Sequence, residues 1–344
     1  MKTVTVNASK AYDIKIGPDL LTTLGEEAKK LGKAKKIAIV SETNVYPLYG
    51  AQAEDSLKAT GFQVVTFVFP AGEESKSAAT YLELLNFLAE NKLTRTDLIV
   101  ALGGGVVGDL AGFAAATYLR GIRFIQVPTT LLAAVDSSVG GKTAIDLPTG
   151  KNLVGAFWQP SLVLCDTDTL ASLPREIFLD GCAEVIKYGI LYDEGFFSYL
   201  ESTGADFDRE AVIARCVEMK RDVVMEDEFD TGARMKLNLG HTIGHGVEAS
   251  SNFTLSHGKS VAIGIAIVSR ASHCPDNHRI IGILEQFGLR TTTQTSAETL
   301  LNYALSDKKR SGGSVNLIIP KAIGNCEIVP TPVENLLTFL EEGL

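Results

Sequence analysis

Short apolar runs alternate with amphipathic segments along the first half of the chain. Apolar runs bounded by turn residues are typical of buried strands, and we predict strands in "KIAIVSETN", "FQVVTFVFP", "DLIVAL", "IRFIQVP" and "PSLVLCD". Helical periodicity predicts helices over residues 48–59 and in "SAATYLELLNFLAENKL". Strands that alternate with helices indicate a parallel sheet with helices on both faces, and such sheets bind ligands at the carboxyl ends of their strands.

The pattern changes after about Thr169. From "LPREIFLDGCAEVIKYGIL" onward almost every stretch has a helical period, and strand signals are scarce until "SVNLIIP". We therefore predict an α/β N-terminal domain over residues 1–170 and a mainly α-helical C-terminal domain over residues 171–344. A cleft between two such domains is the usual place for a ligand.

Charge and composition exclude several classes of protein. The chain has 41 acidic and 32 basic residues, a net charge of -9, and nucleic-acid binding usually needs a basic face. Apolar runs such as "FIQVPTTLLAAV" are interrupted by Pro128, so we expect no membrane span, and the alternating N-terminus "MKTVTVNASKAYDIKIG" lacks the apolar core of an export signal. Five cysteines without paired spacing fit reduced thiols, which predicts a cytoplasmic protein.

The segment "GGGVVG" follows a predicted strand and opens a helix. Its glycines Gly103, Gly105 and Gly108 match G-x-G-x-x-G, where the backbone and a helix N-terminus approach a pyrophosphate. The alternative is a tight strand-to-helix turn without a ligand. The acidic residue expected about 20 positions later for the ribose is absent from "RGIRFIQ". We therefore expect the ribose to be bound from earlier loops, by Glu42 and Asn44 or by "AGEESK", in a Rossmann-like arrangement that departs from the standard one.

The stretch "VDSSVGGKTAID" resembles the end of a phosphate-binding P-loop. A P-loop reads G-x-x-x-x-G-K-[ST], and the position of its first glycine is held here by Asp136. The P-loop interpretation therefore fails. Lys142 is left either as a cation at a reacting centre or as a solvated lysine in a turn.

The stretch "ARMKLNLGHTIGHGVE" predicts a helix with a polar stripe. At about 100° per residue, five side chains fall within a sector of roughly 80°: Arg234, Asn238, His241, His245 and Glu248. With His257 in "LSHGKS" and Glu184 in "CAEVIKYG", the chain offers the ligands of a catalytic zinc site with one open position. Two histidines one turn apart can both bind one ion, so the spacing leaves open which histidine stays free.

These motifs together resemble the family of the 3-dehydroquinate synthases, within the sugar-phosphate cyclases. The resemblance covers nearly the whole chain, through "GGGVVGDLAGFAAATYLRGI", "QVPTTLLAAVDSSVGGKTAID", "GKNLVGAFWQP", "LPREIFLDGCAEVIKYGIL", "RMKLNLGHTIGH" and "SHGKSVAIGI". It implies a Rossmann-like NAD-binding domain, an α-helical metal-binding domain and a homodimer. The implied reaction converts 3-deoxy-D-arabino-heptulosonate 7-phosphate into 3-dehydroquinate and phosphate, by transient oxidation with NAD, phosphate elimination, reduction, ring opening and aldol closure.

The resemblance also implies the site residues. Zinc or cobalt would be held by Glu184, His241 and His257, which leaves His245 for the substrate. NAD would be bound by Ala71, Gly72, Glu73, Glu74, Ser75, Lys76, Gly105, Val106, Val107, Gly108, Asp109, Thr129, Thr130, Lys142, Lys151, Thr169, Leu170, Ala171 and Ser172. The substrate pocket would use Asp136, Lys142, Lys151, Asn152, Lys187, Lys220, Arg234, Asn238, His245 and Lys308. Arg120 would reach the phosphate from the second subunit.

Departures from the family pattern and rival functions stay open. Members commonly have Asp at Glu42 and read "HGEAVA", where this chain has Lys259 and Ser260 beside a predicted ligand. The rivals are a metal-dependent polyol dehydrogenase, a cyclase of another sugar phosphate, and an NAD-binding regulator without activity. Arg234 and Asn238 suit a substrate carboxylate, and lysines gathered on an acidic protein suit a doubly anionic substrate.

Overall fold

The computed structural model describes residues 1–251, 254–306, 310–311 and 313–344, and these form two compact units. Unit 1 contains Met1–Pro174 and Arg209–Phe229, and unit 2 contains Arg175–Asp208 and Asp230–Leu344. The sequence predicts that cofactor binding and metal binding are divided between residues 1–170 and 171–344. This division of function stays a prediction.

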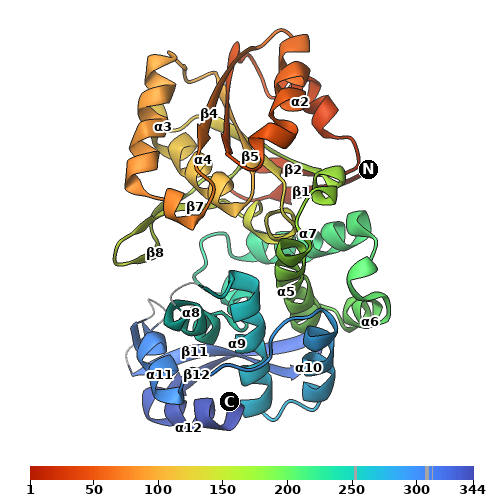
Figure 1. Ribbon diagram of the computed structural model, residues 1–344, viewed down its shortest axis with the longest axis vertical. Helices are drawn as coiled ribbons and strands as arrows, with labels where there is room; N and C mark the ends of the chain where they lie inside the picture. Colours follow the sequence, from red (N-terminus) through yellow and green to blue (C-terminus); the bar gives the residue numbers. More distant parts are fainter. Residues whose placement is uncertain (252–253, 307–309, 312) are drawn as a thin grey trace. The chain divides into compact units, whose positions relative to one another are not determined.

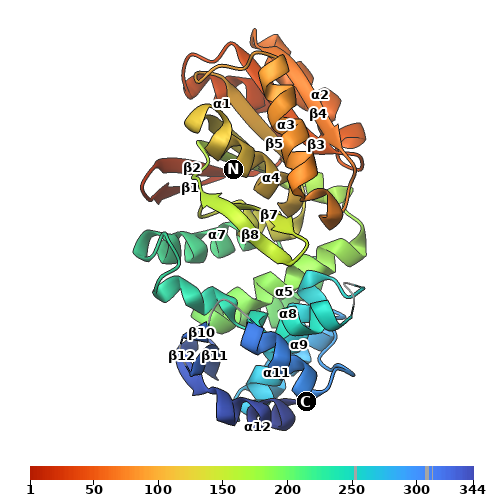
Figure 2. The ribbon, with the colours of Figure 1, turned by 90° about the vertical axis from the view of Figure 1, so that its left-hand side faces the viewer.

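Among the described residues, unit 1 is built on a seven-stranded sheet of order β1-β2-β9-β6-β5-β3-β4 (Figures 1 and 2). The bounds are β1 (Lys2–Asn7), β2 (Ala11–Gly17), β3 (Lys36–Glu42), β4 (Gln63–Phe69), β5 (Leu98–Gly103), β6 (Arg123–Pro128) and β9 (Leu162–Asp166). Neighbouring strands run parallel, apart from the antiparallel pair β1 and β2 at one edge. All the strands predicted in the first half of the chain are therefore present, and the sheet is parallel where they lie.

Helices cover both faces of this sheet, as the alternation of strands and helices predicts. They are α1 (Leu24–Lys30), α2 (Tyr46–Ala59), α3 (Ala78–Glu90) and α4 (Gly105–Thr117), and α7 (Arg209–Glu226) packs against β1 and β2. On one face Leu84 of α3 and Phe113 of α4 pack in a core with Ile99 of β5. On the other face Leu57 of α2 packs in a core with Leu98, the neighbouring position of the same strand. Successive strand residues point to opposite faces, so each face has its own core.

A hairpin outside the main sheet follows β6. It consists of β7 (Lys142–Leu147) and β8 (Gly150–Phe157), which pair antiparallel. The sequence did not predict these strands, because most positions of β8 are exposed and its residues show no alternation of apolar and polar positions.

Unit 2 is mainly helical, as predicted. Its helices are α5 (Arg175–Tyr192), α6 (Glu194–Thr203), α8 (His241–Ser250), α9 (His257–Ala271), α10 (Asn277–Gln286), α11 (Ala297–Ser306) and α12 (Val333–Gly343). Its described strands are β10 (Arg310–Ser311), β11 (Ser314–Ala322) and β12 (Asn325–Pro332), which form an antiparallel sheet. Helix α9 is buried along most of its length because α5, α8, α10 and α12 all pack against it.

Within the described ranges, no helix combines the length and the apolar character that crossing a membrane requires. All five cysteines are buried and none takes part in a disulfide, so they act as small core residues, as expected.

Candidate functional site

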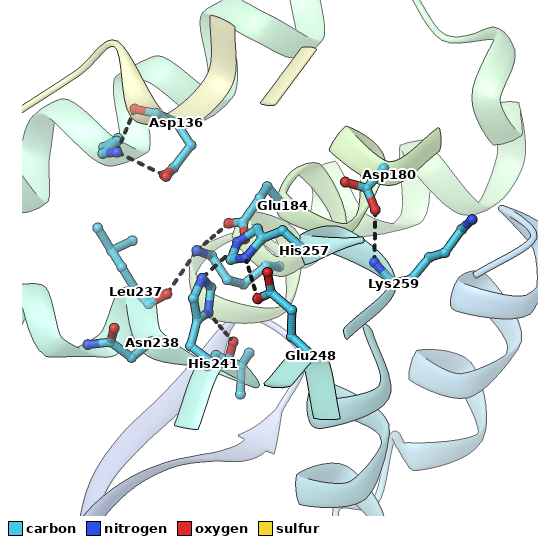
Figure 3. Close-up of polar contacts among 12 residues, drawn as sticks. Asp136, Asp180, Glu184, Leu237, Asn238, His241, Glu248, His257 and Lys259 are labelled. Atoms are coloured by element: carbon cyan, nitrogen blue, oxygen red, sulfur yellow. Dashed lines mark hydrogen bonds and ion pairs between the residues drawn. The ribbon is translucent and has the colours of Figure 1, made fainter. Parts of the chain in front are cut away.

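Three side chains from three helices of unit 2 converge on one point. They are Glu184 of α5, His241 of α8 and His257 of α9, and one ligand atom of each lies within 4.8 Å of the others (Figure 3). The Nε2 atoms of His241 and His257 lie 3.3 and 3.5 Å from Oε1 of Glu184. Three protein ligands, two imidazoles and one carboxylate, are the set that a catalytic zinc site uses. Metal binding by these residues stays a prediction, and the geometry fits it.

The second ring nitrogens of the two histidines also have partners. Nδ1 of His241 lies 3.1 Å from the carbonyl oxygen of Leu239, and Nδ1 of His257 lies 3.7 Å from Oε2 of Glu248. Histidines that bind a metal commonly donate the other ring N–H to a carbonyl or a carboxylate, which fixes the ring and its tautomer. Both Nε2 atoms are thereby directed toward Glu184.

The ionisable groups of this cluster shift one another's pKa values. Burial by itself raises the pKa of the Glu184 carboxyl, but Lys187 and His241 outweigh it and hold that pKa well below its usual range. Burial lowers the pKa of His257, whereas Glu184 and Glu248 outweigh this effect and raise it to about 10. Two carboxylates thus face the two imidazoles, and the buried Lys187 pairs with one of them.

His245 and Lys187 lie beside this cluster. The ring of His245 is centred 5.5 Å from that of His241 and 6.1 Å from that of His257. Lys187 is buried, pairs with Glu184 and donates to the carbonyl oxygen of Leu237 at 2.8 Å. In the structure, His241 and His257 face the Glu184 carboxylate and His245 lies next to them. The sequence spacing alone did not show which histidine lies outside the cluster.

The predicted continuous helix over residues 233–248 is wrong. Residues Ala233–Asn238 form a 3-10 helix, Gly240 has a φ of +76°, and α8 begins only at His241. At Gly240 a Cβ atom would lie 2.6 Å from Cγ1 of Ile265 and 2.7 Å from the carbonyl oxygen of Val261, so α9 packs directly against this backbone. Arg234 and Asn238 consequently do not share the helix of His241, His245 and Glu248.

Replacing Gly240 by alanine is expected to lower the free energy of unfolding by about 1–3 kcal/mol, because the added methyl meets α9 and φ is positive. Gly282, in α10, is the matched control, since no described atom lies within 4 Å of a Cβ built there. Gly282→Ala should raise stability by about 0.5–1 kcal/mol. Urea unfolding of both variants checks this, and equal stabilities would contradict the close packing at Gly240.

Apart from Lys142 in β7 and Lys151 in β8, the residues predicted to bind NAD lie at or just after the carboxyl ends of neighbouring strands in unit 1. They are residues 42–44 at β3, 71–76 after β4, 105–109 after β5, 129–130 after β6 and 169–172 after β9. In the sheet these strands are adjacent, in the order β9-β6-β5-β3-β4. The direction of chain winding reverses between β3 and β5, and ligands of open α/β sheets bind at such switch points. The glycine loop after β5 lies at this one.

Contacts within unit 1 hold these loops together. Lys76 is buried and its Nζ lies 2.6 Å from Oδ2 of Asp109, in the first turns of α4, and it also donates to Asn152. Burial lowers the pKa of Lys76, but Asp109 and Glu73 outweigh it and raise that pKa. The backbone N–H of Ala71 donates to the hydroxyl of Thr43 at 3.0 Å. Two of the predicted NAD segments are therefore joined by a buried ion pair.

The glycine loop permits close packing of α4 against the sheet. Helix α4 begins at Gly105, and a Cβ at Gly108 would lie 2.7 Å from Oε1 of Gln126, so this glycine permits the contact of α4 with β6. The hydroxyl of Thr129 is buried and has no hydrogen-bond partner among the described residues. A buried polar group of this kind fits a polar ligand at the strand ends.

Hydrogen bonds also hold two further loops at this edge. The Glu42 carboxylate accepts from the N–H groups of Asn44 at 2.7 Å and Val45 at 3.0 Å, so it stabilises the start of α2. The Tyr49 hydroxyl donates to the carbonyl oxygen of Thr169 at 3.0 Å and also contacts Ser172. Contact of Glu42 or Asn44 with a ribose stays a prediction.

The stretch "VDSSVGGKTAID" forms a turn that leads into a strand. Residues Ala133–Ser137 make one π-helical turn, a feature frequent at functional sites. Lys220 donates to Asp136 twice, to Oδ1 at 2.9 Å and to the carbonyl oxygen at 2.6 Å. Gly140 and Gly141, at φ +90° and +69°, then turn the chain so that β7 begins at Lys142. A P-loop connects a strand to a helix, so the structure agrees that this is not one.

The other predicted substrate residues are spread over both units. Asp136, Lys142, Lys151, Asn152, Lys220 and Arg120 lie in unit 1, and Lys187, Arg234, Asn238 and His245 lie in unit 2. Lys308 lies outside the described residues. In β8, Asn152 has a φ of +55° and its N–H donates to Asp146 at 2.7 Å. Arg120 is exposed in a turn where Leu119, Arg120 and Gly121 all have positive φ.

One residue that supports the cluster was not predicted. Asp180 lies one helical turn before Glu184 on α5, and its carboxylate binds the first turn of α9, next to His257. The spacing of four residues from Glu184 places both on one helix face, and this is the signal that could have identified it.

Comparison with known proteins identifies the family of this chain. Residues 66–180 match the family described as 3-dehydroquinate synthase N-terminal, and residues 181–310 match 3-dehydroquinate synthase C-terminal. A 3-dehydroquinate synthase of Pelobacter propionicus is 46% identical, over 98% of this chain and 99% of its own. That of Caulobacter vibrioides is 47% identical over 94% of each, and that of Streptococcus suis is 42% identical over 98% of this chain and 99% of its own.

Solved structures show the same fold. A 2-deoxy-scyllo-inosose synthase complexed with carbaglucose-6-phosphate, NAD+ and Co2+ has a TM-score of 0.90 and 25% identity, with all of both chains covered. An iron-containing alcohol dehydrogenase has a TM-score of 0.71 at 16% identity over 98% of this chain and 99% of its own, and it shares the fold alone. Because the family matches cover residues 66–310 and the relatives are 42–47% identical over nearly their whole length, the chain belongs to the 3-dehydroquinate synthase family.

Proposed function

We propose that the chain is a carbon–oxygen lyase that converts 3-deoxy-D-arabino-heptulosonate 7-phosphate into 3-dehydroquinate and phosphate, the second step of the shikimate pathway. The observation that carries this proposal is its identity of 42–47% with 3-dehydroquinate synthases over nearly their whole length. The convergence of Glu184, His241 and His257 supports it, because the residues that the family resemblance implies as metal ligands meet in space.

The proposed metal ligands are Glu184, His241 and His257, and the ion is zinc or cobalt. When bound, the metal would supply Lewis-acid polarisation of a substrate hydroxyl, and NAD would supply reversible hydride transfer. Lys187 keeps Glu184 ionised, while Leu239 and Glu248 orient the two imidazoles. His245 lies beside the cluster, where it hydrogen-bonds the substrate in this proposal.

NAD is proposed to lie along the carboxyl ends of the unit 1 strands. The N-terminal N–H groups of α4, at Gly105 and the residues that follow, would receive the pyrophosphate, since a helix N-terminus favours anions. The buried hydroxyl of Thr129 would donate to the cofactor. The ion pair between Lys76 and Asp109 holds the loop after β4 against α4, which keeps the binding edge in one arrangement.

The substrate has a phosphate and a carboxylate, and the proposed pocket supplies cations for both. The proposed groups are Asp136, Lys142, Lys151, Asn152, Lys187, Lys220, Arg234, Asn238, His245 and Lys308. Fixed cations and hydrogen-bond donors stabilise charge that develops as phosphate leaves and an enolate forms. Lys220 is held against Asp136, so this lysine is positioned before any ligand arrives.

We also propose a cytoplasmic homodimer that does not bind nucleic acid. Leu153, Val154 and Phe157 of the hairpin are exposed, and Phe157 packs against the exposed Phe229. Exposed apolar groups of this kind suit a contact with a second copy, and Arg120 would then reach the partner's phosphate site. Reduced thiols fit the reducing cytoplasm, and the net charge of -9 does not suit nucleic acid.

Phosphate release with a trace of NAD tests the proposed reaction. The purified protein with zinc or cobalt and the heptulosonate phosphate is expected to release many phosphates per NAD, because the cofactor is reduced and reoxidised in each turnover. One NADH formed per turnover would indicate a polyol dehydrogenase. Preferred release of phosphate from glucose 6-phosphate would indicate another cyclase, and binding of NAD without turnover would indicate a regulator.

A further inference from the structure

Asp180 connects the helix of Glu184 to the helix of His257. It lies on α5, and its Oδ1 accepts a hydrogen bond from the hydroxyl of Ser256. The same oxygen accepts another, at 2.9 Å, from the backbone N–H of Lys259 (Figure 3). His257 lies between these two donors in the sequence. One carboxylate on α5 therefore holds the backbone on both sides of a proposed metal ligand.

Asp180 takes the place of a capping residue for α9. The first N–H groups of a helix have no partners within the helix, and an N-cap side chain normally accepts from one of them. Ser256 is the N-cap of α9, yet its side chain makes no capping bond to the described first turn and donates to Asp180 instead. The negative charge of Asp180 at the N-terminus of α9 is favourable as well.

Gly258 brings the two helices into backbone contact at this point. A Cβ there would lie 2.0 Å from the carbonyl oxygen of Asp180 and 2.8 Å from its Oδ1, so any side chain would separate the helices. The side chain of Lys259 points away from the cluster, and only its N–H is used (Figure 3). Lys259, which departs from the family pattern, thus contributes only its backbone N–H to the contact with Asp180.

We propose that Asp180 is a positioning residue for His257, and that it sets the affinity of the Glu184–His241–His257 cluster for a divalent metal. His257 is the first residue of α9, so any shift of that first turn moves its imidazole relative to Glu184. Glu248 orients the ring through Nδ1, whereas Asp180 fixes the backbone that carries the ring. Groups that orient ligands in this way commonly determine metal affinity. The inference rests on the proposed metal site.

The test measures the affinity of the metal-free protein for Co2+. The protein is titrated with Co2+ against a chelator of known affinity, and the visible absorption of the bound ion reports its coordination. Asp180→Ala is expected to raise the Kd at least about tenfold and to change the absorption spectrum, because His257 is no longer held in place. Lys259→Ala is the matched control and should bind Co2+ as the unsubstituted protein does, since its side chain is not used.

Each outcome decides a separate question. A folded Asp180→Ala variant, judged by thermal unfolding, that binds Co2+ with unchanged affinity and spectrum would overturn the role of Asp180. If that variant does not fold, Asp180→Asn is tested instead, because its amide keeps one acceptor oxygen for the two hydrogen bonds but lacks the negative charge. About threefold weaker binding is then expected, and unchanged binding overturns the inference. Failure of the unsubstituted protein to bind Co2+ would overturn the proposed metal site itself, and the inference with it.

Discussion

Replacing Glu184 by alanine is expected to abolish tight binding of a divalent metal and to lower phosphate release on the order of 10³-fold. Glu184 is the only carboxylate in the three-residue cluster found among the described residues, and both imidazole Nε2 atoms face it. Metal content of the purified variant and its rate of phosphate release check this. Full metal content with normal turnover would show that the ligand set is wrong.

The same substitution is expected to lower stability, because Lys187 is buried and would lose its carboxylate partner. Breaking one side of a buried ion pair costs about 3–5 kcal/mol. The double variant Glu184→Ala/Lys187→Met should recover part of this loss without regaining the metal, which separates the two roles of Glu184. Glu176→Ala, an exposed carboxylate on the same helix, should leave metal content and turnover unchanged.

Replacing Lys142 by alanine is expected to leave NAD binding intact and to lower turnover by about 10²–10³-fold. Lys142 begins β7 directly after two glycines of positive φ, and the other residues predicted to bind NAD lie in or after other strands. Its ammonium group would therefore stabilise charge on the reacting substrate rather than hold the cofactor. Fluorescence titration with NADH and steady-state phosphate release measure the two effects separately.

A matched control for this variant is Lys33→Ala, which removes an exposed lysine in a loop before β3. This control should match the unsubstituted protein in both measurements. If Lys142→Ala instead lost NAD binding and kept its turnover at saturating NAD, the lysine would be a cofactor ligand and its proposed role would be wrong.

Local sequence patterns were sufficient for most of unit 1. The strands β3, β4, β5, β6 and β9 and the helices between them followed from apolar runs and helical periodicity, because a parallel sheet covered on both faces buries its central strands, although the edge strand β4 is only partly buried. No strands were predicted at β1, β2, β7 and β8. The two-stranded sheet of β7 and β8 lies outside this core and is largely exposed at β8. Burial is the source of the pattern, so an exposed hairpin leaves little trace in it.

Composition and motifs also identified the residue types of the site, but not how they meet. The polar stripe assumed one helix through residue 240, whereas Gly240 breaks it, since α9 approaches that backbone too closely for any side chain. Which two histidines join Glu184 depends on how α8 and α9 pack against α5. No local period contains that information.

The sequence by itself therefore determined the fold class, the alternation of strands and helices along the first half of the chain, the glycine loop after a strand and the residue types of the metal cluster. Each of these depends on local periodicity or on a motif confined to one short segment. Only the tertiary structure decided that His241 and His257 face Glu184 with His245 beside them, and that Asp180 binds the N-terminus of α9. Convergence of residues so distant in the chain is a property of helix packing, which arises from contacts among all the helices of unit 2 at once.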